Sequence, residues 1–381
     1  MVEKIYAVYT TEDNPFEQMC ESLIAQIDNK DTVLKIVFFG ESLNNEEYLI
    51  YLGILNRRVQ SHFTEQAPPI SYISQKPFKG MLNAEVMSIP STENVLIHYG
   101  KNYILLENEI CRELITGGII PPDIYAPLAL QADAVFEQVG EILAVENFPV
   151  SSIIRQWNYI PKIFNVNGKD QNYQSFNDSR SLFYAKTDWS LGYPASTGIG
   201  TPSGGIMVEL IALTGLALIN RPLNNPLQIA AYNYSQGVLV GDFDPCTQKR
   251  TTPKFERGRI IGTDESQTIL ISGTAAIRGE LSLIADDIIE QTRITMQNID
   301  YLISPENYPV AETSREYKLL RIYIKNPFQM NEVNTWMNLH HPDTPKIYLC
   351  ADICRKELLI EIEGVAEIKK HDTKIKSIIP Q

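Results

Sequence analysis

The sequence is short of positive charge. It has 33 lysines and arginines against 46 aspartates and glutamates, and its formal net charge is −13 at pH 7. Nucleic acids and anionic membranes attract proteins mainly through clustered cations, so this balance argues against a general binder of either. It still allows a local basic pocket that holds a small acid.

Signals for disulfides, secretion and membrane insertion are also missing. The five cysteines are odd in number and have no disulfide-like spacing. No apolar run approaches the roughly 20 residues that a membrane helix needs. Met1-Val2-Glu3-Lys4 leads directly into a strand-like Ile5–Tyr9 rather than a signal peptide. We therefore expect a cytoplasmic, reduced protein with neither a membrane nor a nucleic-acid partner.

Phosphate-loop and metal motifs are absent as well. The glycines of residues 198–200 and 203–205 are not followed by the Lys-Ser/Thr of a phosphate loop and lack the spacing of a dinucleotide turn. His340-His341 with Cys350 and Cys354 fits no common zinc-ligand spacing. The sequence therefore predicts turns and close strand packing at the glycines, and no metal site.

What the chain does contain is an internal repeat. Its 381 residues are enough for two or three structural units. The peptide Ala132–Gln138 recurs as Ala285–Gln291, and each copy opens a predicted helix. The helix of the second copy has one apolar stripe: Ile289, Thr292, Met296, Ile299 and Ile303. Asp287 and Glu290 give this helix a start that resembles a capping box.

The same elements follow each copy in the same order. They are a strand, a second helix, a proline-led strand and a glutamate-bearing strand. The first copy places them at 153–157, around 173–184, at 194–197 and at 207–210; the second places them at 319–323, around 330–338, at 345–348 and at 359–362. Such alternation predicts an α+β fold with helices packed on one face of a mixed sheet.

We divide the chain into residues 1–90, 91–220 and 221–381. The last two ranges are the repeated units, and their meeting clefts are natural ligand sites. The first range, with strand-like Val33–Phe39, is predicted to be an N-terminal α/β extension outside the repeat. Because tandem units mimic an oligomer interface, we expect a monomer.

A strand near the C-terminus carries the most reactive side chains. Over residues 358–363, three apolar residues alternate with Leu359, Glu361 and Glu363, and Cys354 precedes them. A carboxylate beside a thiol could be a general acid with a tuned pKa. It could equally lie on the solvated face of an edge strand, which the string alone favours. Glu209, at the matching place in the first copy, has no Cys-Arg before it, and we expect it to be structural.

Longer motifs resemble a known family. Ser272-Gly273, then Asp287, Gln291 and Asn298, then Glu361-Ile362-Glu363 resemble the YjgF/RidA pattern. The tandem arrangement resembles the chorismatases, through five segments in family order: Arg155–Pro161, Tyr173–Arg180, Pro194–Gly200, Pro253–Arg257 and Cys354 with Glu361. The likeness covers about residues 90 to 367. It implies two tandem YjgF/RidA-like (chorismate-mutase-like α+β barrel) units behind the N-terminal extension.

The resemblance also implies a reaction. Chorismatases cleave the enolpyruvyl ether of chorismate without a cofactor and release pyruvate, and Glu361 takes the place of the acid that protonates the enolpyruvyl methylene carbon. Cys354, seven residues earlier, resembles the subtype in which the substrate's own hydroxyl attacks and 3-hydroxybenzoate forms. Other subtypes use water and give a dihydroxycyclohexadiene carboxylate, or give mixed 3- and 4-hydroxybenzoate.

A dianionic substrate needs cationic donors. Arg180, Arg257 and Arg155 each lie in a family-like motif, and we assign them with Tyr173 and Gly198 to substrate binding. For Arg155 alone, a surface arginine paired with a neighbour is an equal alternative. Tyr173 could instead simply pack its helix.

Two segments depart from the family pattern. Glu256 stands where a small residue is more usual, and Gly279-Glu280-Leu281 replaces a common Gly-His-Glu. We expect Glu256 to point away from the substrate or to pair with an arginine. The rival interpretations are a non-catalytic ligand- or partner-binding homologue and an imine deaminase like the single-unit relatives.

Overall fold

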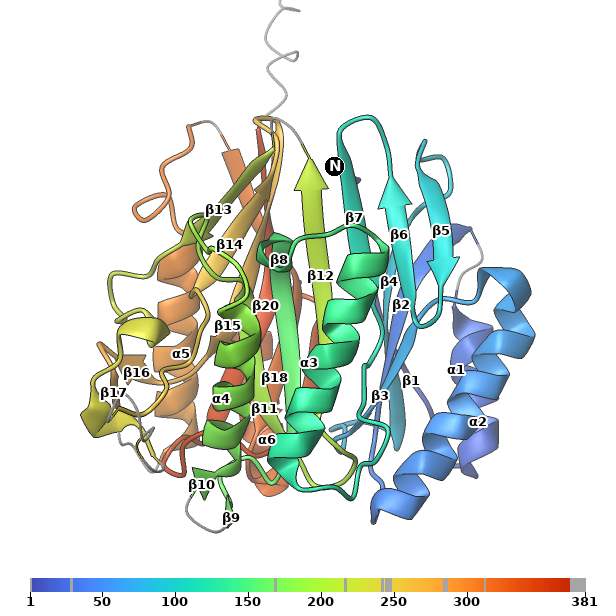
Figure 1. Cartoon of the computed structure of the whole chain (residues 1–381), viewed down its shortest axis with the longest axis horizontal. Helices are drawn as coiled ribbons and strands as arrows, with labels where there is room; N and C mark the ends of the chain where they lie inside the picture. The colour runs from blue at the N-terminus through green and yellow to red at the C-terminus, as the bar shows by residue number, and fades with distance from the viewer. Residues whose placement is uncertain are drawn as a thin grey trace, which may run out of the picture.

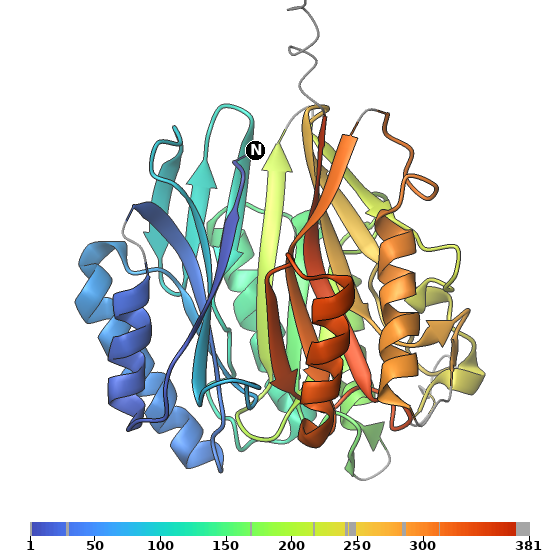
Figure 2. The same ribbon diagram turned by 180° about the vertical axis from the view of Figure 1, so that it is seen from behind.

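The structure is a computed structural model. It describes residues 2–27, 30–167, 170–215, 218–240, 243, 249–283, 287–311 and 313–370. Three mixed sheets lie side by side at the centre, and the helices lie outside them on both sides of the molecule (Figures 1 and 2). Ala285 and Asp286, which begin the second copy of the repeated peptide, lie outside the described residues.

The first sheet belongs to the N-terminal unit. Its elements are β1 (Ile5–Thr10), α1 (Phe16–Gln26), β2 (Asp31–Gly40), α2 (Asn45–Phe63), β3 (Ile70–Ser74) and β4 (Leu82–Pro90). The strand order is β1-β4-β2-β3, and β2 and β3 form its parallel pair.

The second sheet belongs to the middle unit. Its elements are β5 (Leu96–Gly100), β6 (Tyr103–Glu107), β7 (Cys111–Thr116), α3 (Leu128–Val145), β8 (Ile153–Pro161), α4 (Asn172–Tyr184), β11 (Ala195–Thr201) and β12 (Met207–Gly215). The strand order is β5-β6-β7-β12-β8-β11, with β8 and β11 parallel. A small hairpin, β9 (Val166–Asn167) and β10 (Asp170–Gln171), precedes α4.

The third sheet belongs to the third unit. Its elements are β13 (Ile219–Leu223), β14 (Gly258–Gly262), β15 (Ser266–Thr274), α5 (Ile288–Ile303), β18 (Thr313–Ile324), α6 (Met330–His340), β19 (Lys346–Cys350) and β20 (Ile360–Lys370). The strand order is β13-β14-β15-β20-β18-β19, with β18 and β19 parallel. A two-stranded hairpin, β16 (Ile277–Arg278) and β17 (Leu281–Ser282), lies beside it.

The three units repeat one topology. The middle and third sheets have the same strand order and directions, so the predicted α+β repeat is confirmed. The N-terminal sheet matches the last four strands of each: β1-β4-β2-β3 corresponds to β7-β12-β8-β11 and to β15-β20-β18-β19. Residues 1–90 therefore share the topology of the repeat, although they share no recognisable peptide with it.

Alternation along the strands separates two kinds of packing. Ile360 and Ile362 of β20 join the apolar cluster that also contains Met296 and Ile299 of α5. Glu361 and Glu363, between and beyond them, point to the opposite face, where the sheets meet one another. The helices thus cover one face of each sheet, while the contacts between sheets combine buried polar side chains with apolar ones such as Trp157, Ile211 and Val365.

The predicted helix start in the third unit is confirmed. The Asp287 carboxylate accepts the backbone N–H groups of Ile289 at 2.7 Å and Glu290 at 3.3 Å, which satisfies two free donors of the first turn. Of the described helices, none is both long and apolar enough to cross a membrane.

Candidate active site

A cavity opens between the middle and third units. It has about 850 Å³ of empty space, counting its mouth to solvent. Six of the seven predicted site residues line it: Glu361, Cys354, Arg180, Arg257, Tyr173 and Gly198. They come from α4 and β11 of the middle unit and from β20 and two loops of the third unit. The fold therefore brings together residues that are up to 188 positions apart in the chain (173 to 361).

The two units are joined at the floor of this cavity. Ser196 N–H of β11 donates to Ser272 Oγ at 2.8 Å, and Gly273 N–H donates to Thr197 Oγ1 at 3.0 Å. Ser272 and Gly273 lie where the register between β15 and β20 shifts. A Cβ atom on Gly273 would overlap Glu361 Oε1. Glycine at this bulge therefore leaves the space that the Glu361 carboxyl occupies.

Glu361 is a buried carboxyl with no counter-ion in the part of the chain that the structure describes. Its strand β20 lies between β15 and β18, and the residue is 5% exposed, so the edge-strand alternative is wrong. Among the described residues, no hydrogen bond or ion pair engages its carboxyl. Burial raises the pKa of Glu361 to about 8; the charge of Glu363 adds to this effect, while Arg257 and Arg155 oppose it. The group therefore holds its proton at neutral pH.

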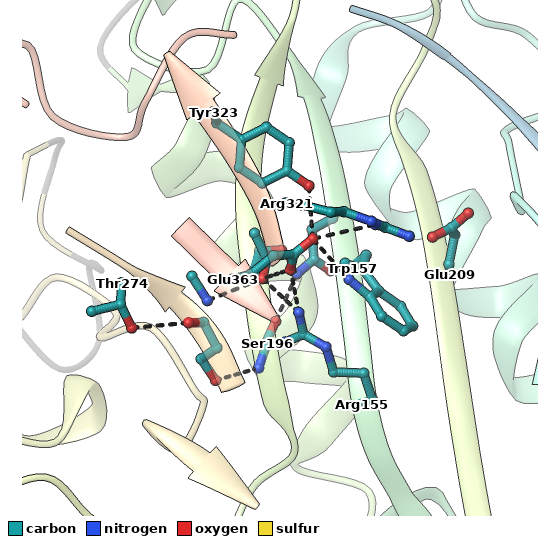
Figure 3. Close-up of polar contacts among 12 residues, drawn as sticks. Arg155, Trp157, Ser196, Glu209, Thr274, Arg321, Tyr323 and Glu363 are labelled. Atoms are coloured by element: carbon teal, nitrogen blue, oxygen red, sulfur yellow. Dashed lines mark hydrogen bonds and ion pairs between the residues drawn. The ribbon is translucent and has the colours of Figure 1, made fainter. Parts of the chain in front are cut away.

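Glu363, two residues further along β20, is in the opposite state. Burial alone would raise its pKa, but Arg155 and Arg321, helped by two hydroxyls, hold the pKa below its ordinary value. Four contacts converge on its carboxylate in Figure 3: Arg155, Trp157 Nε1 at 3.1 Å, Tyr323 Oη at 2.7 Å and Arg321 Nη1 at 3.2 Å. Thr197 Oγ1 donates to it as well. One strand therefore carries a protonated and an ionised glutamate.

Arg155 is the predicted site residue that does not line the cavity. Its guanidinium is 1% exposed and is bound to Glu363 and Thr197. The surface-arginine alternative is also wrong, because the side chain is fully buried between two units. Arg155 therefore acts on the cavity without lining it, through its charge and through the neighbours that it binds.

Two buried arginines do reach the cavity wall. Arg180 is 1% exposed and donates from Nη2 to Asn177 Oδ1 at 2.5 Å. Arg257 is 3% exposed and donates from Nη2 to Ile229 O at 2.5 Å and to Tyr234 Oη at 2.7 Å. The Nε atoms of both are buried and find no hydrogen-bond partner within the described part of the chain. Such guanidinium groups are suited to a small anion that supplies the missing acceptors.

Cys354 and Tyr173 are neutral. Burial raises the pKa of the Cys354 thiol to about 12, and the nearby Glu361 adds to the rise. Burial likewise raises the pKa of Tyr173 above its ordinary value. The Tyr173 ring covers β11 at Gly198, where a Cβ atom would come within 3.0 Å of the ring. The cavity therefore offers a phenol donor and a weakly polar thiol, rather than a thiolate nucleophile.

The two departures from the family pattern lie off the cavity wall. Glu256 Oε1 accepts the backbone N–H of Tyr193 at 3.1 Å, and burial raises the pKa of this carboxyl. Glu280 accepts both the N–H and the hydroxyl of Ser235, at 2.7 and 2.6 Å. Neither adds a negative charge to the wall.

Sequence reasoning missed other lining residues. Arg355 lines the cavity and donates to Glu280 O at 2.9 Å and Ser282 Oγ at 3.0 Å. Its place directly after Cys354 in a family-like motif was the signal for it. Tyr234 carried no such signal, because it lies in an irregular segment between β13 and β14.

The middle unit is similar to a known protein family. Residues 118–212 match the family model "Chorismatase FkbO/Hyg5-like, N-terminal", a range that begins just after β7 and includes most of β12. The chain is a relative of the chorismatases. This confirms the sequence resemblance. The matched range of this chain includes Arg155, Tyr173, Arg180 and Gly198.

Two curated relatives come from Streptomyces hygroscopicus. A 3-hydroxybenzoate synthase is 28% identical over 233 residues, which are 58% of this chain and 65% of that protein. A chorismatase is 27% identical over 241 residues, 61% of this chain and 66% of that protein. The chain thus aligns with just under two thirds of the length of these chorismatase relatives.

A solved structure supports the fold. A chorismatase crystal structure superimposes with a TM-score of 0.68 and 20% identity, covering 96% of this chain and 98% of that chain. The helices and strands of this chain are therefore arranged as in a known fold over nearly its whole length.

Proposed function

We propose that this chain cleaves the enolpyruvyl ether of chorismate and releases pyruvate and 3-hydroxybenzoate. One observation carries the proposal: Glu361 is a protonated carboxyl that has no counter-ion among the described residues, in a cavity with two buried arginines. The relation to proteins named chorismatase and 3-hydroxybenzoate synthase supports the choice of substrate.

Glu361 supplies the proton that starts the reaction. Carbon is a slow base, so an acid that protonates the enolpyruvyl methylene must still hold its proton near neutral pH. Burial gives Glu361 a pKa of about 8, which meets this need. A positioned acid contributes about 10²–10⁴ in rate. Protonation leaves an oxocarbenium ion at the ether carbon, beside the newly formed Glu361 carboxylate, whose charge stabilises it.

Arg180 and Arg257 hold the two carboxylates of the substrate. A hydrogen bond to a charged group is worth about 1.5–3 kcal/mol. Two such contacts therefore favour binding of a dianion in this cavity, although the chain as a whole has a net charge of −13. Tyr173 donates a further hydrogen bond from its neutral phenol. These contacts turn the enolpyruvyl group toward Glu361 at the floor of the cavity.

The product follows from what captures the oxocarbenium ion. The thiol of Cys354 is a weak hydrogen-bonding group and does not hold an attacking water well. The hydroxyl of the substrate ring is then the nearest nucleophile. Its oxygen attacks the neighbouring ring carbon and displaces the ether oxygen, so the ether bond to the ring breaks, pyruvate leaves with that oxygen as its carbonyl, and the hydroxyl proton passes to Glu361. The epoxide formed on the ring then opens at the bond to the carbon that first bore the hydroxyl, and the C–H proton of the other carbon is transferred to the oxygen as the ring becomes aromatic. Pyruvate and 3-hydroxybenzoate together contain all the atoms of chorismate, so no water is consumed and the acid is restored.

The test is to mix the purified chain with chorismate, measure pyruvate with lactate dehydrogenase and NADH, and separate the aromatic products by chromatography. We expect pyruvate and 3-hydroxybenzoate in equal amounts. A dihydroxycyclohexadiene carboxylate or a mixture with 4-hydroxybenzoate would contradict the role given to Cys354. Chorismate binding without pyruvate above the uncatalysed rate would instead identify a non-catalytic ligand-binding protein.

A further inference from the structure

The glutamate in the cavity has a counterpart in each of the other units. The register of β4, β12 and β20 against their antiparallel partners aligns three pairs: Glu85 with Val37, Glu209 with Trp157, and Glu361 with Tyr323. All three glutamates are buried. The same fold position therefore places one carboxyl at each contact between units.

A cation stands two residues before each of these partners. The three are Lys35 on β2, Arg155 on β8 and Arg321 on β18. At two contacts the cation of one unit neutralises the glutamate of the next. Arg321 binds Glu85 through two hydrogen bonds of 2.6 Å, and Lys35 Nζ lies 3.1 Å from Glu209 Oε2.

The third contact breaks this pattern. If this contact followed the other two, Arg155 of the middle unit would neutralise Glu361 of the third unit. Arg155 binds Glu363 instead. The hydroxyls behave alike: Ser71 donates to Glu209, whereas Thr197, at the matching place on β11, donates to Glu363. The cation and the hydroxyl that would stabilise an ionised Glu361 therefore both contact the next glutamate along the strand.

The residue that binds Arg155 and Thr197 is a glutamate in the third unit but not in the other two. Opposite Lys35 stands Met87, opposite Arg155 stands Ile211, and opposite Arg321 stands Glu363. In the first two units this position is apolar and competes for no cation. We infer that Glu363 is a positioning residue that binds Arg155 and Thr197 and so keeps the counter-ion of the fold away from Glu361.

Several charged or titratable groups surround Glu361, and the experiment must separate their effects on its pKa. Arg155 on β8, Arg257 before β14, Glu363 on the same strand, Cys354 before β20 and Tyr173 on α4 all interact with its charge. Of these, Arg155 and Glu363 form one ion pair. Replacing Glu363 by Gln releases Arg155, and Glu361 becomes the carboxylate that Arg155 can pair with, as Lys35 pairs with Glu209.

The experiment compares three variants: Glu363→Gln, Arg155→Gln and the double variant. The inference rests on the proposed function for its activity readout, the pH above which kcat/KM for chorismate declines. Glu363→Gln should lower this limit by at least about one pH unit, so that the ratio of activity at pH 8 to that at pH 6 falls about fivefold or more. Arg155→Gln should raise the limit or leave it unchanged. The double variant should restore it to the wild-type value or above.

A merely structural Glu363 would give a different pattern. Glu363→Gln would then lower kcat by the same factor at every pH, and the double variant would not recover the limit. If Glu363→Gln does not fold, a limit in Arg155→Gln that falls below the wild-type value overturns the inference.

A second readout needs no activity. Infrared difference titration of the protonated carboxyl band, assigned with Glu361→Gln, gives the titration midpoint of Glu361 directly. A midpoint that falls in Glu363→Gln and recovers in the double variant supports the inference even if chorismate is not the substrate. A midpoint that stays fixed overturns it even if pyruvate is produced.

Discussion

The contact between the N-terminal and middle units and the contact between the middle and third units place the same glutamate in two chemical states. Glu209 is buried against the Lys35 ammonium and accepts the Ser71 hydroxyl. Glu361 is buried beside an open cavity and has neither. The backbone around both is alike, so the difference comes from side chains alone. A fold can thus convert a structural ion pair into an acid by giving its cation another partner.

The largest effect should come from removing the acid. Glu361→Gln keeps the shape of a neutral carboxyl but has no proton of suitable acidity to donate, so kcat for pyruvate release should fall by about 10²–10⁴. Because Gln cannot ionise in the unfolded chain as Glu361 does above pH 4.5, the urea midpoint of unfolding at pH 7 should rise rather than fall. Steady-state kinetics and urea unfolding measure both. Wild-type turnover in this variant would place the acid elsewhere.

The matched substitution at the other contact should do the reverse. Glu209→Gln leaves the Lys35 ammonium buried without a carboxylate, and removing one partner of a buried pair costs about 3–5 kcal/mol of the free energy of unfolding. The protein that remains folded should keep its kcat. The control is Lys35→Met with Glu209→Leu, which removes both charges and should recover most of the loss. A cost below about 1 kcal/mol for the single change would show that Glu209 is not held as an ion pair.

These two glutamates also show what the sequence can reveal. Local patterns were sufficient for the elements: the Ile289–Ile303 stripe and the Asp287 cap predicted α5, and the alternation around Glu361 predicted β20. Motif order was sufficient for six residues of the cavity. The ion pair of Arg155 was not predictable, because its partner Glu363 is 208 residues away in the sequence and belongs to another unit.

The N-terminal unit gives the same lesson at a larger scale. Topology depends on hydrophobic alternation and strand pairing, which many sequences satisfy, so β1 to β4 repeat the fold without repeating any peptide. Lys35 and Glu85 became recognisable as counterparts of Arg155 and Glu361 only through the strand register. Register is set by contacts between distant segments, and no local pattern contains it.

The pH dependence should separate the two glutamates of β20. Glu361 must be protonated to react, so kcat/KM should be level below pH 7 and fall about tenfold per unit above its pKa of about 8. Stability changes with pH in the same direction. The pKa of Glu361 is raised from 4.5, so its contribution is present below pH 4.5 and is lost as the pH rises through 8.

Glu363 has the opposite sign. Its pKa is lowered from 4.5, so its contribution is present above pH 4.5 and is lost as the pH falls through the lower value. Chemical denaturation from pH 4 to 9 should therefore show a decline toward high pH that Glu361→Gln removes. A decline that persists in that variant would belong to another group.

The smallest effect should be at Cys354, which we expect to affect the fate of the oxocarbenium ion rather than its formation. Cys354→Ser puts a strong hydrogen-bonding hydroxyl where a weak thiol stood, and this hydroxyl can hold a water for attack. Pyruvate release should change by less than about tenfold, because Glu361 is untouched. The ratio of dihydroxycyclohexadiene carboxylate to 3-hydroxybenzoate should rise about tenfold, a difference of about 1.4 kcal/mol between the two capture steps. Cys354→Ala, which removes the thiol without adding a hydroxyl, is the control and should raise the ratio less. Chromatography of the products decides between them: an unchanged ratio in Cys354→Ser would show that the shape of the cavity around Tyr173 and Gly198, and not Cys354, selects the nucleophile.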